Sequence, residues 1–152
     1  MGPAGSVTGG PEGAEKRGKT ARARANPSIP DWLELHLKLS EKYLKEAEDF
    51  LAKGDHVQAS EKAWSAAAQM VKAVAAREGR VLRSHRELHE YVAELSKEAG
   101  DREVVRLWLA ASSLRQNFYE NWLPGDAVKS AVEDVKVFVE KLRSYFYKSL
   151  IK

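Results

Sequence analysis

The chain contains no cysteine among its 152 residues. Disulfide bonds and thiolate zinc sites are therefore excluded, and the fold must be held together by packing. No run of about 18 apolar residues occurs, so we expect no membrane-spanning helix. Asparagine and glutamine occur three times each, whereas 31% of the residues are charged. This composition is typical of a protein from a hyperthermophile.

The positive net charge comes from the first 30 residues, which hold five basic and two acidic side chains. The same residues include six of the ten glycines and four of the five prolines. The remaining residues carry 20 basic and 20 acidic side chains. We expect residues 1–29 to form a disordered basic tail, because they hold little apolar surface to bury. The tail lacks the apolar core of a secretory signal, and we expect a cytoplasmic protein.

From residue 30 onward the apolar residues recur with helical spacing, and no alternating strand pattern occurs. Gly54, Gly79, Gly100 and Pro124-Gly125 divide this region into five segments. The sequence therefore predicts an all-α fold over residues 30–152, an up-and-down bundle of four long helices plus one shorter helix. Each long helix is expected to reach about 20 residues, or about 30 Å.

Helix starts are predicted at Asp55, at the capping box formed by Ser84 and Glu87, at Asp101 and at Asp126. Aromatic side chains fall on the apolar faces of the second and fourth helices. We expect them to lie in the core rather than to form a stacking surface. They are Trp64, Trp108, Phe118 and Trp122.

The usual catalytic motifs are missing. No cysteine nucleophile, Gly-x-Ser-x-Gly turn or glycine-rich phosphate loop occurs. His85 and His89 have the i, i+4 spacing of a metal-binding pair, but further ligands are not placed beside them. The sequence predicts no metal site and no cofactor, and we expect His85 to pack at the edge of the core.

Two segments are candidates for ligand binding. Arg80, Arg83, His85 and Arg86 lie around a helix start, where they can form a phosphate pocket. Alternatively, these arginines pair with the many glutamates of the chain.

The second candidate is a polar cluster near the end of the fourth helix, formed by Arg115, Asn117 and Asn121. It can hydrogen-bond a nucleotide, or the asparagines can cap the chain reversal at Pro124-Gly125. Glu61 is expected to be half-buried and paired with Arg115 or with the 80–86 loop. We expect the loop and Arg115 to share one polar recess with no imidazole beside the guanidinium.

Four stretches carry a resemblance to a known family: residues 54–64 (GDHVQASEKAW), 71–73 (VKA), 84–88 (SHREL) and 114–120 (LRQNFYE). With them the chain resembles the archaeal PaREP repeat-element proteins over about residues 31–146. That family is in turn similar to the HEPN superfamily of helical bundles, which implies a HEPN-like fold and a homodimer with its site at the dimer cleft.

The HEPN resemblance leaves three functions open. Some HEPN proteins are metal-independent ribonucleases, whose signature is an arginine followed after four to six residues by a histidine. Here Arg115 is followed by Glu120, Asn121 and Trp122 at those positions, so the sequence predicts a noncatalytic domain that binds a nucleotide, RNA or a partner protein. The alternatives are a ribonuclease that uses Arg80 and His85, or an adaptor for a minimal nucleotidyltransferase.

Overall fold

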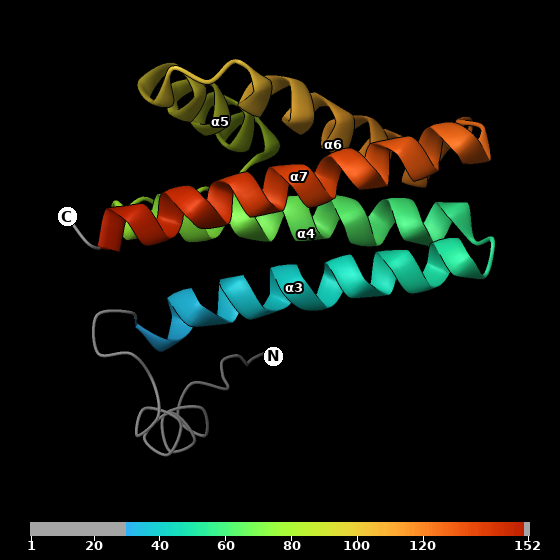
Figure 1. The fold of residues 1–152 in the computed structure, drawn as a ribbon, viewed down its shortest axis with the longest axis horizontal. Coiled ribbons are helices and arrows are strands. Elements are labelled where there is room, and N and C mark those ends of the chain that lie inside the picture. The colour runs from blue at the N-terminus through green and yellow to red at the C-terminus, as the bar shows by residue number, and fades with distance from the viewer. Residues whose placement is uncertain (1–29, 151–152) are drawn as a thin grey trace, which may run out of the picture. The chain divides into compact units, whose positions relative to one another are not determined.

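Residues 30–150 are described by a computed structural model, which consists of five helices and, within this range, no strand (Figure 1). The expected disordered tail, residues 1–29, lies outside the described residues. The all-α prediction is confirmed. The helices are α3 (Asp31–Ala52), α4 (His56–Arg77), α5 (His85–Ala99), α6 (Glu103–Glu120) and α7 (Gly125–Leu150).

The chain divides into two compact units after Leu35. In the described part of the first unit, the Pro30 carbonyl accepts hydrogen bonds from the amides of Leu33 and Glu34, at 3.1 and 3.0 Å, and α3 begins there. The second unit holds α3 from His36 onward and the other four helices. The expected boundary between the tail and the bundle at residues 29 and 30 stays a prediction.

Helix α4 is the central helix of the second unit and contacts α5, α6 and α7. It also contacts α3, where the Ser40 hydroxyl donates to the carbonyl of Ala66 at 2.8 Å. Eight of the buried α4 side chains are alanines, which allow neighbouring helices to approach closely. Among the described helices, none has an apolar stretch long enough to cross a bilayer.

Three of the predicted local signals form helix ends, all at α4 and α5. The Asp55 carboxylate accepts a hydrogen bond from the Gln58 amide at 3.1 Å and caps α4. At the start of α5, the Ser84 hydroxyl accepts from the Glu87 amide at 3.1 Å, while the Glu87 carboxylate accepts from the amide of Arg83. Gly100 ends α5 with a positive φ of 65°, a conformation that glycine adopts without steric cost.

Three expectations about α6 and α7 are wrong. Helix α6 has 18 residues and ends at Glu120, because Asn121 takes a left-handed conformation with φ of 51°. Trp122 therefore follows the helix and is 60% exposed rather than buried. Helix α7 begins at Gly125, so that Asp126 lies inside its first turn and is not its cap. Of the other aromatic residues expected in the core, Trp108 is 2% exposed, whereas Trp64 and Phe118 are only half-buried.

Candidate functional site

A cluster of aromatic and basic side chains forms where α4, α5 and α6 meet. The Arg115 guanidinium lies over two rings, with its Cζ 6.0 Å from the Trp64 ring centroid and 5.4 Å from that of Tyr119. The imidazole of His85 contacts Trp64 as well, with 5.6 Å between the ring centroids. We call Trp64, His85, Arg115 and Tyr119 the Trp64 site. It brings together residues from three helices that are distant in sequence.

The Trp64 site carries positive charge without a neutralising carboxylate on Arg115. Among the described residues, no carboxylate forms an ion pair with this guanidinium, whose contacts are the two rings. Desolvation of the imidazole lowers the pKa of His85, and the nearby charges of Arg115 and Lys72 lower it further. The lowered pKa favours the neutral imidazole at pH 7, in which one ring nitrogen can accept a proton.

The arrangement corrects one expectation about Arg115. We expected no imidazole beside its guanidinium, because the sequence has no histidine at positions 120 to 122. The structure brings His85 and Arg115 to the same indole ring, and the charge of Arg115 acts on the pKa of His85. The imidazole comes from the start of α5, thirty residues earlier in the chain, and not from α6.

The arginines of the 80–86 loop are held elsewhere. Arg80 donates to the Glu94 carboxylate at 2.6 Å and lies over the Tyr91 ring, and the hydrogen bond to Glu94 raises the pKa of Arg80. Arg86 pairs with Glu90 one turn along α5, at 2.9 Å. Two of the three arginines thus pair with glutamates, the alternative that the sequence left open. Arg83 is exposed.

The two asparagines belong to the turn between α6 and α7. Asn117 is fully buried, and its side-chain oxygen accepts hydrogen bonds from the amides of Trp122 and Leu123, both at 2.8 Å. Its side-chain NH₂ donates to the Ser60 hydroxyl at 3.0 Å. The side chain of Asn117 is thus engaged in capping the chain reversal, and Asn121 is the left-handed residue that ends α6.

Glu61 is half-buried, but its partners differ from those expected. It forms an ion pair with Lys62 at 3.8 Å and accepts a hydrogen bond from the Ser65 hydroxyl at 3.4 Å. The expected pairing with Arg115 or with the 80–86 loop is therefore wrong. Because neighbours on α4 hold this carboxylate, it leaves the charge of Arg115 unneutralised.

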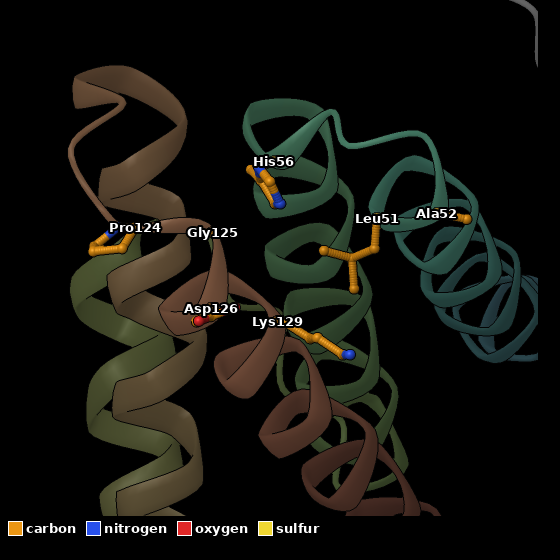
Figure 2. A pocket seen from close by; sticks show the side chains of 7 residues that line it. All are labelled: Leu51, Ala52, His56, Pro124, Gly125, Asp126 and Lys129. Atoms are coloured by element: carbon orange, nitrogen blue, oxygen red, sulfur yellow. The ribbon is translucent and has the colours of Figure 1, made fainter.

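Two pockets flank His56 at the opposite end of α4 from the 80–86 loop. The first has a volume of about 460 Å³, and its lining side chains come from α3, α4 and the start of α7 (Figure 2). They are Leu51, Ala52, His56, Pro124, Gly125, Asp126 and Lys129. The second, of about 440 Å³, includes Asn121. Lysine and aspartate line both pockets, so neither favours a ligand of one charge.

The sequence did not indicate His56 as a pocket residue. Its ring lies directly against the backbone of Gly125, where an added Cβ would come within 2.8 Å of the imidazole Cε1. The sequence shows only a glycine after a proline, which is also typical of an ordinary turn. In the part of the chain that the structure describes, no three histidine, aspartate or glutamate side chains gather to hold a metal ion.

The fold and this site define a class of protein: a small all-α bundle with a cationic aromatic cluster at the junction of three helices. The sequence profile of the archaeal PaREP1/PaREP8 family matches residues 35–139. The chain belongs to this family, as the resemblance predicted.

A solved structure agrees with this assignment. The chain is similar to the crystal structure of a protein from Sulfolobus solfataricus, with 32% sequence identity and a TM-score of 0.61. The similarity covers 74% of this chain and 96% of that one. No match was found among curated proteins.

Proposed function

We propose that this chain is a noncatalytic binding domain for a nucleotide, either free or within single-stranded RNA, and that the Trp64 site is where it binds. The observation that carries the proposal is the Arg115 guanidinium, which lies over two aromatic rings and pairs with no carboxylate among the described residues. Such a cation can contact a phosphate, because no carboxylate in the described part of the chain is paired with it.

The aromatic groups of the site suit the other part of a nucleotide. Tyr119 is 67% exposed, so part of its ring can accept a stacked base. Base–aromatic stacking contributes about 1–3 kcal/mol per base and tolerates any sequence. The HEPN-like resemblance agrees with nucleotide binding. It also adds a homodimer to the proposal, and sedimentation of the purified protein would test this oligomeric state.

The test is binding of a fluorescein-labelled single-stranded RNA, followed by fluorescence anisotropy, with ADP as an unlabelled competitor. Arg115→Ala should weaken RNA binding about tenfold, since it removes a charged phosphate contact. Arg106→Ala is the matched control, because it removes the same charge from an exposed position on the opposite side of α6.

The competition experiment distinguishes free nucleotide from RNA as the ligand, and the variants test the site. If ADP displaces the labelled RNA, free nucleotide is a ligand of the site. If ADP leaves RNA binding unchanged, the protein recognises single-stranded RNA and not the free nucleotide. Equal loss in Arg115→Ala and Arg106→Ala would mean that only net charge matters, and would overturn the site. If the parent protein binds neither probe, the proposal is wrong and the adaptor for a nucleotidyltransferase becomes the leading function.

A second candidate function, metal-independent RNA cleavage, is favoured by the position of His85. A neutral imidazole beside an arginine can take the proton of a ribose 2′-hydroxyl, whose oxygen then attacks the adjacent phosphate. A 2′,3′-cyclic phosphate forms, the bond from phosphorus to the 5′-oxygen breaks, and that oxygen takes up a proton from the imidazolium or from water, while the guanidinium stabilises the charge on the phosphate. The arginine in this arrangement is Arg115, whereas the spacing in the sequence had suggested Arg80. Purified protein with a chelator should then cut RNA, and His85→Ala should abolish the cutting. Intact RNA after incubation would exclude this function.

A further inference from the structure

His89 forms a hydrogen bond that fixes which of its two nitrogens carries the proton. The indole N–H of Trp108 lies 2.7 Å from the Nδ1 of His89, and the two rings meet edge to face with centroids 5.6 Å apart. An indole nitrogen can only donate, so Nδ1 must accept. In the neutral imidazole the proton therefore resides on Nε2.

The same bond also orients the ring. Trp108 is 2% exposed, so the bond holds one edge of the imidazole against the core, while His89 as a residue is exposed. Its Nε2–H has no hydrogen-bond partner among the described residues. A neutral imidazole whose Nδ1 lone pair accepts from Trp108 and whose Nε2 carries the proton has no lone pair left for a metal ion. The group that it presents to solvent is the Nε2–H donor, whose orientation is fixed by the hydrogen bond from Trp108.

His89 is linked to the Trp64 site through Trp108, whose indole contacts both His89 and Trp64. The ring centroids of Trp108 and Trp64 are 5.1 Å apart, and His85 precedes His89 by one turn on α5. We propose that His89 is a further ligand-binding residue beside this site, whose Nε2–H donates to a phosphate oxygen of the bound RNA or nucleotide. The inference rests on the proposed function and adds a residue that neither the sequence motifs nor the family assigns.

Replacing His89 by asparagine or by glutamine separates its proposed contact with the ligand from its hydrogen bond with Trp108. The side-chain oxygen of His89→Asn can take the place of Nδ1 and accept from Trp108, but the outward donor is lost. His89→Gln carries its NH₂ about as far out as Nε2, but leaves the Trp108 indole without its acceptor. We expect the Asn variant to melt like the parent and to bind labelled single-stranded RNA about tenfold more weakly.

The Gln variant should behave in the opposite way, with RNA binding close to that of the parent and a lower melting temperature. If His89 has only a structural role, RNA binding should weaken only in the Gln variant, which melts at a lower temperature. Unchanged RNA binding by a well-folded Asn variant would overturn the inference while leaving the proposed function intact.

Nitrogen-15 chemical shifts of the His89 ring provide a readout that is independent of any ligand. They should show the proton on Nε2, and a proton on Nδ1 in the free protein would overturn the inference whatever the binding data show. If the parent protein binds neither RNA nor ADP, the proposed function fails and the ligand contact of His89 fails with it, whereas the tautomer is still decided by the shifts.

Discussion

The substitution Asn117→Ala tests how much of the stability depends on the turn between α6 and α7. The Asn117 side chain is fully buried and makes three hydrogen bonds, to the Ser60 hydroxyl and to the amides of Trp122 and Leu123. A typical intramolecular hydrogen bond contributes about 0.5–1.5 kcal/mol net, and a buried group left without its partner costs more. We therefore expect Asn117→Ala to lower the free energy of unfolding by about 2–4 kcal/mol.

Calorimetry and urea denaturation followed by circular dichroism measure this change. For a domain of this size, 1 kcal/mol corresponds to about 2–4 °C in the melting temperature, so the variant should melt about 5–15 °C lower. Gln116→Ala is the matched control, since Gln116 is the exposed neighbour on the same helix turn and should change stability by less than about 0.5 kcal/mol. A loss below about 1 kcal/mol in Asn117→Ala would refute the reasoning.

Two further predictions concern other connections between helices. The Asp101 carboxylate accepts hydrogen bonds from Lys141 and Tyr145 on α7, at 2.8 and 2.7 Å, and these bonds lower the pKa of Asp101. The folded state therefore gains stability above the unfolded pKa, near 4, and loses it as the pH falls further. Asp101→Asn should show a smaller loss than the parent between pH 5 and pH 2 in urea titrations, and an equal loss would contradict this. Gly125→Ala should destabilise the protein by about 1 kcal/mol by displacing the His56 ring, but should be neutral or stabilising in a His56→Ala background. A double-mutant cycle of melting curves without this change of sign would be evidence against the contact.

The helix ends that could be predicted are those specified by adjacent residues. Asp55, Ser84 with Glu87, and Gly100 each act within four positions of the chain, so their residue types alone indicate the capping geometry. The sequence left open that Asn117 and Asn121 cap the chain reversal, but it did not place the end of α6 at Glu120. Asn117 accepts hydrogen bonds from the amides of Trp122 and Leu123 while its NH₂ group donates to Ser60 on a different helix, a contact that the neighbouring residue types do not indicate.

The candidate site shows the same limit on prediction from sequence. Arg115 was predicted because a cation lies within an aromatic pattern on one helix. Its nearness to His85 depends on how α4, α5 and α6 pack, because Trp64 of α4 forms the contact between the two. For the loop arginines, the sequence suggested a phosphate pocket that the structure does not form. Arg80 and Arg86 form a dense cationic motif in the sequence, but Arg80 pairs with Glu94, and Arg86 pairs with Glu90 one turn along α5.

The alanine-rich core of α4 has a consequence for how this sequence can vary. The three adjacent buried residues Ala66, Ala67 and Ala68 face different directions around the helix, so α4 is enclosed on most sides over this turn. A larger side chain at any of them would push a neighbouring helix away, and close-packed interiors resist such shifts. Positions 66 to 68 can therefore change only together with the helix that faces each new side chain, whereas residues on the outer faces of the other helices can be replaced more freely.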